Sequence, residues 1–217
     1  MKIFLDSANL KEIEEAVSLG IIDGVTTNPS LMAKEGKLSM LKIAGRICQL
    51  VKGPVSLEGG ALNFKDMVNE GKKLARISKN VVVKIPMTKD GIKAVSILAS
   101  QGIKTNVTLI FTVNQAILAA KAGATFVSPF IGRLDDIGET GIDLIHELVV
   151  VFRNYGTKTQ ILAASIRNPN QVRQSAVAGA HIVTIPFKIL TAMYEHQLTA
   201  KGIEIFQKAW NEKNKKI

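Results

Sequence analysis

Apolar and polar positions follow two alternating patterns along the chain. Short runs rich in valine, isoleucine and leucine are followed by longer segments in which apolar residues recur with helical period. This order continues from one end to the other and is typical of repeated strand–helix units. The short runs predict eight strands, at residues 2–6, 24–28, 55–58, 81–86, 103–109, 126–131, 161–165 and 181–186.

Capping residues support the helical segments between these strands. N-cap candidates stand at Asn9, Thr112 and Asn168, and Pro169 follows at a first helical position. A side-chain oxygen at the N-cap accepts backbone N–H groups that the first helical turn leaves unpaired. We therefore expect helices to begin directly after these residues.

Eight strand–helix units are the number that closes a (β/α)8 TIM barrel. An open doubly wound sheet alternates in the same way, but it normally has a glycine-rich nucleotide loop after its first strand, where residues 6–9 here read Asp-Ser-Ala-Asn. No linker or composition shift divides the chain. We predict an α/β fold: a single (β/α)8 barrel domain over residues 1–217, with an extra C-terminal helix at about 199–213.

The composition bears on the cellular location of the protein and on whether it can form disulfide bonds. The opening residues, MKIFLDSAN, resemble neither a secretory signal nor an organelle presequence, and no apolar run is long enough to span a bilayer. The one cysteine, Cys48, excludes an intrachain disulfide and suits a reducing cytoplasm. Its apolar helical position predicts a buried, inert thiol. We expect a cytoplasmic protein that makes no contact with a membrane.

The formal charge of +10 favours anionic partners. The basic residues are dispersed, however, aromatic residues are few, and the one concentrated basic run, at 213–216, is typical of a solvated tail. We therefore expect no nucleic acid as partner, although a barrel that only binds an anion or nucleic acid stays an alternative. Small phosphorylated substrates match the same charge.

Polar residues near the carboxyl ends of the predicted strands are the candidate site. In a barrel, alternate residues of each strand point inward, and those near these ends line the active site. Within a strand the polar positions keep one parity, so that they share a face. The set consists of Asp6, Thr26, Asn28, Glu58, Lys84, Asn106, Thr108, Ser128 and Ser165, with Arg133 and Arg167 just beyond strands six and seven.

Lys84 is the sharpest candidate, because an inward lysine between Val83 and Ile85 is costly to keep charged. A neutral amine can attack a carbonyl and form an imine. A solvent-facing lysine is the ordinary alternative. Two carboxylates, Asp6 and Glu58, favour the imine because that chemistry needs proton transfers at two substrate positions.

The other candidate polar residues are arginines that could bind an anion, and histidines and aspartates that could bind a metal. The guanidinium forks of arginines after strands six and seven suit a phosphate, with ordinary surface arginine as the alternative. No metal site is predicted: His146, His181 and His196 fall on different elements, and Asp135 and Asp136 are expected in a glycine-containing loop without the calcium-loop pattern.

A series of strings along the chain resembles the small single-domain transaldolases, from residue 2 to about residue 210. They are LDSAN, GVTTNPSL, VVVKIPMT, KTNVTLIF, FVSPFIGRLDDIG and AASIRNP. The resemblance implies that Lys84 forms the Schiff base, that Asp6 is the acid/base at the substrate C4 hydroxyl, and that Glu58 with Thr108 holds a proton-shuttling water. It also implies binding of the dihydroxyacetone moiety by Asn28, Asn106 and Ser128, and phosphate binding by Arg133 and Arg167. We expect Thr26, Phe130 and Ser165 to bind substrate as well.

Fructose 6-phosphate aldolases of the same superfamily differ at two site positions. They carry glutamine where Glu58 stands and tyrosine where Phe130 stands, so this sequence favours the transaldolase and leaves the aldolase as the alternative. One departure from the family is Gly59-Gly60, where bulkier residues are usual. Two glycines add backbone freedom beside Glu58.

The resemblance implies a reaction and an assembly. A dihydroxyacetone unit would pass between ketose phosphates, such as sedoheptulose 7-phosphate and fructose 6-phosphate, and aldose phosphates, such as glyceraldehyde 3-phosphate and erythrose 4-phosphate, in the pentose phosphate pathway. No cofactor or metal is expected, because the protonated imine is itself the electron sink. An apolar stripe of Ile203, Phe206 and Trp210 motivates a homo-oligomer, a pentamer or decamer in the resembling family, with packing of the stripe on its own barrel as the alternative.

Overall fold

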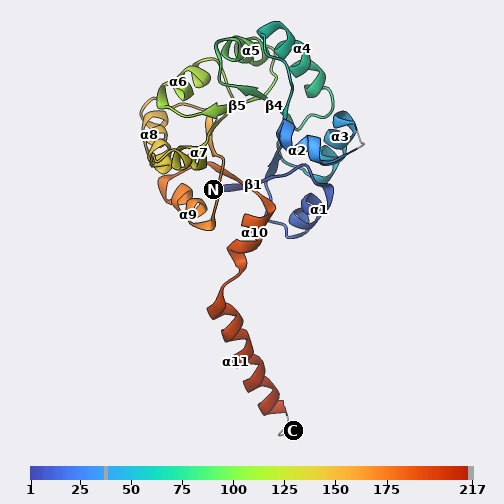
Figure 1. Cartoon of the computed structure of the whole chain (residues 1–217), viewed down its shortest axis with the longest axis vertical. Coiled ribbons are helices and arrows are strands. Elements are labelled where there is room, and N and C mark those ends of the chain that lie inside the picture. The colour runs from blue at the N-terminus through green and yellow to red at the C-terminus, as the bar shows by residue number, and fades with distance from the viewer. Residues whose placement is uncertain (37–38, 215–217) are drawn as a thin grey trace.

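The computed structural model describes residues 1–36 and 39–214. Its eight parallel strands close into a barrel (Figure 1). Each strand pairs with its neighbour in sequence, and β1 pairs with β8. The prediction of a (β/α)8 barrel is confirmed; the last part of the basic run at 213–216 lies outside the described residues. The strands are β1 (Lys2–Asp6), β2 (Gly24–Thr26), β3 (Val55–Glu58), β4 (Val81–Pro86), β5 (Thr105–Ile110), β6 (Phe126–Pro129), β7 (Gln160–Ala163) and β8 (Ile182–Ile185).

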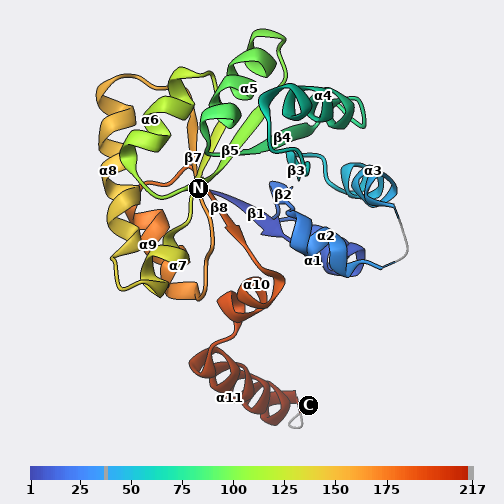
Figure 2. The same ribbon diagram turned by 45° about the horizontal axis from the view of Figure 1, so that its top comes forward.

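Helices surround the barrel, as the two ribbon views show (Figures 1 and 2). The predicted caps are in place: Asn9 accepts from the backbone of the first turn, Thr112 forms a capping box with Gln115, and Asn168 accepts from the backbone N–H of Gln171. The helices are α1 (Leu10–Ser18), α2 (Pro29–Lys34), α3 (Met40–Leu50), α4 (Phe64–Ala75), α5 (Lys89–Ser100), α6 (Val113–Lys121), α7 (Ile131–Asp136), α8 (Gly141–Asn154), α9 (Pro169–Ala178), α10 (Phe187–Tyr194) and α11 (Gln197–Asn214).

The protein has two apolar layers, and the inner one occupies the inward positions near the start of the strands. The larger one lies between the strands and the surrounding helices. The smaller one fills the interior, where Phe4 and Phe126 pack edge to face with ring centroids 6.1 Å apart. Gly24 makes room for this packing, because a Cβ there would lie 2.7 Å from the Phe4 ring. Inward positions further along the same strands are therefore free to carry polar side chains.

The described part of the chain ends in two helices, of which the sequence predicted one. Helix α10 follows β8 and packs against β1 and α9. Helix α11 begins two residues before the predicted start and stands away from the barrel (Figure 1). Its Ile203, Phe206 and Trp210 are 51%, 75% and 66% exposed, so the stripe does not cap its own barrel.

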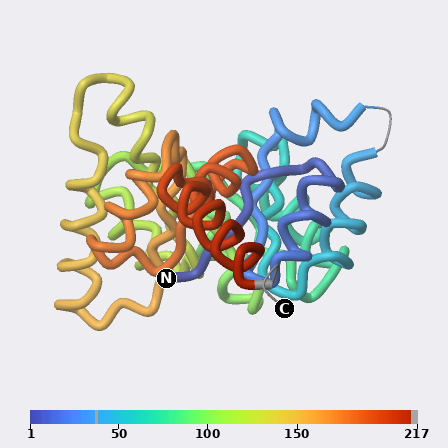
Figure 3. The backbone as a smooth tube through the Cα atoms, turned by 90° about the horizontal axis from the view of Figure 1, so that it is seen from below, coloured from blue at the N-terminus to red at the C-terminus, as the bar shows by residue number. Residues whose placement is uncertain are grey.

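The two ends of the barrel are distinct. Seen from the side, the N-terminus lies at one end of the barrel, while α2 and α7 rise at the other (Figure 3). That second end is where the strands finish and where the predicted site residues are found. No helix in the described part of the chain is long and apolar enough to cross a membrane.

Candidate active site

Lys84 lies inside the barrel and contacts two oxygen atoms. Its Nζ is 3.0 Å from Oε2 of Glu58 on the neighbouring strand and 3.0 Å from the carbonyl oxygen of Thr27, to which it donates a hydrogen bond. The two charged side chains are only 8% and 15% exposed. A carboxylate at this distance from an amine can form an ion pair with it and can exchange a proton with it.

This arrangement corrects the physical reason given for Lys84 from the sequence. Val83 and Ile85 belong to the apolar layer between barrel and helices, so they point away from the amine. Because side chains alternate across a strand, a residue's sequence neighbours are on the opposite face. The immediate environment of Lys84 is therefore polar, and its partners come from β3 and the segment after β2.

Asp6 is the second buried carboxylate of the interior. Burial is the main cause that raises the pKa of Asp6 above its ordinary value, and the charge of Glu58 raises it further. A hydrogen bond from Thr26 Oγ1 to Asp6 Oδ1, 2.8 Å long, and the charge of Lys84 act in the opposite direction. Asp6 is thus poised to exchange a proton at a higher pH than an exposed aspartate.

Two chains of buried side chains connect the remaining polar positions. The hydroxyl of Thr26 is 2.6 Å from that of Thr184, and Asn106 links Ser56 with Ser128 through hydrogen bonds of 3.2 and 2.7 Å. Sequence reasoning missed Thr184 and Ser56. Their signal was parity, since Ser56 stands two residues before Glu58 on β3 and Thr184 stands two residues after the inward Ile182 on β8.

These side chains line a cavity of about 190 Å³ at the carboxyl ends of the strands. Ten of the twelve predicted residues line it, together with Ala164 and Thr184. Glu58 and Thr108 do not. Glu58 reaches the site through Lys84, whereas the hydroxyl of Thr108 is buried and has no hydrogen-bond partner among the described residues. The ten are Asp6, Thr26, Asn28, Lys84, Asn106, Ser128, Phe130, Arg133, Ser165 and Arg167.

The cationic rim of the cavity is made by α7 and the segment after β7. The guanidinium carbon of Arg133 is 5.1 Å from the centre of the Phe130 ring, and Arg167 forms an exposed ion pair of 2.8 Å with Asp136. Gly132 allows the close approach, because a Cβ there would lie 1.9 Å from the carbonyl oxygen of Ser165. Two arginines from different elements thereby line the same cavity.

The sequence predicted a loop around Asp135 and Asp136, and this prediction was wrong. Asp135 and Asp136 end helix α7. The carboxylate of Asp135 accepts from the backbone N–H of Gly141 and from the side chain of Gln171, so it joins α7 to α8 and α9. A short helix was hidden because six residues give too little periodicity to recognise. Among the described residues, no cluster of acidic, histidine or cysteine side chains could hold a metal ion.

Of the two glycines after Glu58, the structure explains the first, Gly59. A Cβ on Gly59 would lie 2.2 Å from Oε2 of Glu70, whereas nothing lies within 4 Å of one on Gly60. The same Glu70 oxygen accepts from the backbone N–H of Ala61 at 2.9 Å. Helix α4 thus anchors the loop that follows the strand of Glu58, and glycine is what lets its carboxylate reach the backbone.

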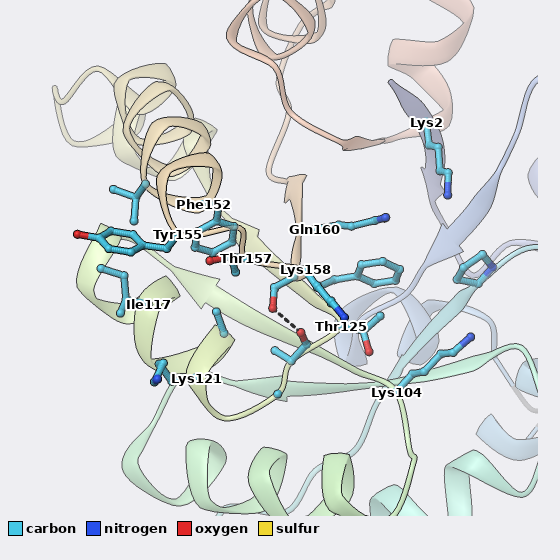
Figure 4. A pocket seen from close by; sticks show the side chains of 17 residues that line it. Lys2, Lys104, Ile117, Lys121, Thr125, Phe152, Tyr155, Thr157, Lys158 and Gln160 are labelled. Atoms are coloured by element: carbon cyan, nitrogen blue, oxygen red, sulfur yellow. Dashed lines mark hydrogen bonds between the residues drawn. The ribbon is translucent and has the colours of Figure 1, made fainter.

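A larger groove, of about 1100 Å³, lies at the opposite end of the barrel (Figure 4). Lys2, Lys104 and Lys158 and the rings of Phe152 and Tyr155 are part of its lining. None of the described residues that line it carries a carboxylate or a histidine. The groove therefore has no acid/base partner for its amines, and the smaller cavity is the better candidate site.

The fold and the site define a (β/α)8 barrel with a buried lysine in a polar cavity at the carboxyl ends of its strands. Residues 3–217 match the family model described as "Transaldolase/Fructose-6-phosphate aldolase". The chain belongs to this family, as the resemblance predicted. The enzyme class predicted from the sequence, a transaldolase-type transferase, is supported by the same findings.

Relatives of the same length carry one description. The chain is 58% identical to a "Probable transaldolase" of Caldicellulosiruptor saccharolyticus over all of both chains. It is 56% identical to a "Probable transaldolase" of Methanococcus maripaludis, over 97% of this chain and 98% of that one. Among solved structures, a thiamine phosphate pyrophosphorylase from Pyrococcus furiosus is similar with a TM-score of 0.60 at 13% identity, covering 85% of each chain. That likeness concerns the fold alone.

Proposed function

We propose that this enzyme is a transaldolase that transfers a dihydroxyacetone unit between sugar phosphates through a Schiff base on Lys84. The observation that supports it most directly is the buried amine of Lys84, 3.0 Å from the carboxylate of Glu58 and open to the cavity that Asp6 also lines. Membership of the family makes sugar phosphates the substrate class. The donors are fructose 6-phosphate and sedoheptulose 7-phosphate, and the acceptors are erythrose 4-phosphate and glyceraldehyde 3-phosphate, as in the pentose phosphate pathway.

The first half of the reaction forms the imine. Glu58 takes a proton from the Lys84 ammonium, and the free amine adds to the C2 carbonyl of the ketose phosphate. The carbinolamine then loses its hydroxyl as water while the nitrogen keeps a positive charge. Glu58 returns the proton needed for this loss through a water held with Thr108, whose buried hydroxyl is unpaired among the described residues.

The second half breaks and remakes a carbon–carbon bond. The Asp6 carboxylate takes the proton of the C4 hydroxyl, the C3–C4 bond breaks, and its electron pair moves to the iminium to give an enamine. The shortened aldose phosphate leaves. The enamine then attacks the aldehyde of the acceptor, whose new hydroxyl takes the proton back from Asp6, and water releases the product from Lys84.

The other lining residues hold the substrate. The amide groups of Asn28 and Asn106 and the hydroxyls of Thr26 and Ser128 suit the hydroxyls of a dihydroxyacetone moiety. Arg133 and Arg167 suit the phosphate, and Ser165 lines the same cavity. None of these steps requires a metal or an organic cofactor.

The aldolase alternative differs in what happens to the enamine. An aldolase protonates it and releases free dihydroxyacetone, whereas a transaldolase keeps it for an acceptor. Phe130 has no hydroxyl to position water for that protonation, and its ring contacts Phe111 and lies beside Arg133. We therefore place the enzyme with the transaldolases and propose that release is slow.

The assembly and the location complete the proposal. We propose one domain over residues 1–217 acting in the cytoplasm, without nucleic acid or membrane as partner. The exposed stripe on α11 supports a homo-oligomer, a pentamer or decamer, in which Phe206 and Trp210 pack against a neighbouring subunit. Light scattering tests the assembly: the proposal expects a large closed oligomer, and a monomer at micromolar concentration would rule it out.

The activity is tested with fructose 6-phosphate as donor and erythrose 4-phosphate as acceptor. The proposal expects transfer by the wild type and by Lys104→Arg, a lysine variant at the opposite end of the barrel, and none by folded Lys84→Ala. Transfer that survives in Lys84→Ala would overturn the role of Lys84. Circular dichroism of each variant establishes that the loss is chemical and not due to unfolding.

A further inference from the structure

Thr184 is a buried polar residue of the site to which the reaction above gives no task. It is the inward side chain near the end of β8, only 5% exposed, and it lines the cavity. Its hydroxyl lies 2.6 Å from that of Thr26, which in turn is 2.8 Å from Asp6 Oδ1. A continuous chain of two hydroxyls therefore ends on the carboxylate.

Counting protons fixes the direction of this chain. A threonine hydroxyl has one proton to donate, and Thr26 gives it to Asp6 when Asp6 is a carboxylate. The short contact between the two threonines then requires Thr184 as the donor. Both O–H dipoles point at the carboxylate, and hydrogen bonds aligned in this way strengthen one another inside a protein.

Resting on the proposed function, we propose that Thr184 is a positioning residue for the reaction: through Thr26 it stabilises the carboxylate form of Asp6, the form that accepts the C4 proton. Burial opposes that form, as the raised pKa of Asp6 indicates. The hydroxyl chain offsets part of this opposition without adding a charge to the cavity. It also holds the Thr26 hydroxyl toward Asp6, so that the Oδ2 atom is left for the substrate.

Other charged groups around Asp6 come from several elements. The neighbouring strands β2 and β8 bring no titratable side chain. The chain of hydroxyls is therefore the contribution of these two strands to the proton affinity of Asp6. The charged groups on the other elements are Lys84 on β4 and Glu58 on β3, whose charges act on Asp6, and Arg133 and Arg167, which line the same cavity. Glu12 on α1 accepts a hydrogen bond from Ser7, the residue after Asp6.

The test compares Thr184→Val, which removes the donor at nearly constant shape, with Thr184→Ser, which keeps it. We expect the acid limb of the kcat/KM profile for transfer to move upward by about half a pH unit in Thr184→Val, with a fall in kcat of roughly threefold near that limb. Thr184→Ser should restore the wild-type profile. Thr105→Val is the matched control, because Thr105 is also a buried strand threonine but its hydroxyl has no partner among the described residues.

Each outcome separates two readings. An unchanged acid limb in Thr184→Val would overturn the proposal, and a rise in KM alone would make Thr184 a substrate contact instead. A shift also seen in Thr105→Val would assign the effect to general loosening and overturn it too. Borohydride trapping on Lys84 distinguishes a failure of the proposed function from a failure of this inference. No trapping in the wild type contradicts the proposed function. Trapping in the wild type, together with an unshifted pH profile in Thr184→Val, contradicts the role of Thr184 only.

Discussion

Glu58 and Lys84 stand opposite each other on the adjacent parallel strands β3 and β4, with Oε2 and Nζ 3.0 Å apart. The register of the sheet creates this pair, since the two residues are direct partners across the strands. The two side chains form an ion pair in the barrel interior, where water has little access. The carboxylate is therefore the group best placed to exchange a proton with the amine, as the proposed mechanism requires.

Glu58→Gln should slow imine formation because the amide cannot take the ammonium proton. General acid–base catalysis of this kind contributes about 10²-fold or more, so we expect a loss of that order in the rate of single-turnover trapping with fructose 6-phosphate. Folding should survive, because glutamine still accepts a hydrogen bond from Lys84. Trapping at the wild-type rate would show that Glu58 is not the base.

Phe130→Tyr should move the balance from transfer toward release. The new hydroxyl can position water near the enamine, which Phe130 cannot do. We expect more free dihydroxyacetone from fructose 6-phosphate alone, relative to transfer when erythrose 4-phosphate is present. Phe111→Tyr, at the ring 6.0 Å from Phe130, is the control for a hydroxyl added nearby. A ratio unchanged in Phe130→Tyr, or already dominated by release in the wild type, would contradict the account.

Activity should fall on acidification at a higher pH than an ordinary aspartate would impose. The Asp6 carboxylate must accept the C4 proton, and burial raises its pKa above the usual 3.8, so protonation removes the base early as pH falls. A profile of kcat/KM against pH measures this limb. An acid limb at the ordinary aspartate value would contradict it.

The same raised pKa predicts that Asp6→Asn stabilises the fold near neutral pH. A group whose pKa is higher in the folded state contributes stability below its unfolded pKa and loses it as pH rises through the folded pKa. Removing the charge should therefore raise the melting temperature near neutral pH, and by less at pH 4. Thermal unfolding at the two pH values checks the sign, and transfer should be lost in the same variant.

Gly59→Val should push aside the Glu70 carboxylate, which accepts a hydrogen bond from Ala61 in the loop after Glu58, because the added Cβ would lie 2.2 Å from that carboxylate. We expect a lower melting temperature and lower kcat, while Gly60→Ala, which adds a Cβ in open space, should leave both near wild type. The double variant Gly59→Val with Glu70→Ala removes the clash and should recover part of the loss. Additive losses in the double variant would contradict the contact.

The sequence predicted the barrel and its inward polar residues well because strand parity is set by local geometry. Strands β1, β3 and β4 have the bounds expected from their apolar runs. The end of β5 was less predictable, since Leu109 adopts a φ of 60° at a register shift between Val107 and Ile110. Such an irregularity depends on the neighbouring strand, which local patterns do not contain.

The environment of each candidate was harder to predict than its position. The ion pair of Lys84 and the hydroxyl chain from Thr184 to Asp6 depend on which residues face each other across strands. That information lies in the register of the sheet and not in any one segment. The roles of the site residues stay predictions, since geometry alone does not test them.

The central claim is that Lys84 forms an imine with a ketose phosphate, and borohydride trapping tests it most directly. The enzyme is incubated with fructose 6-phosphate, reduced with sodium borohydride, digested, and its peptides are analysed by mass spectrometry. The account predicts a reduced adduct on Lys84 that depends on the sugar phosphate and is missing in Lys84→Ala, with Lys104 unmodified in the same sample. No adduct on Lys84 in an active preparation, or an adduct on another lysine in its place, would contradict the account.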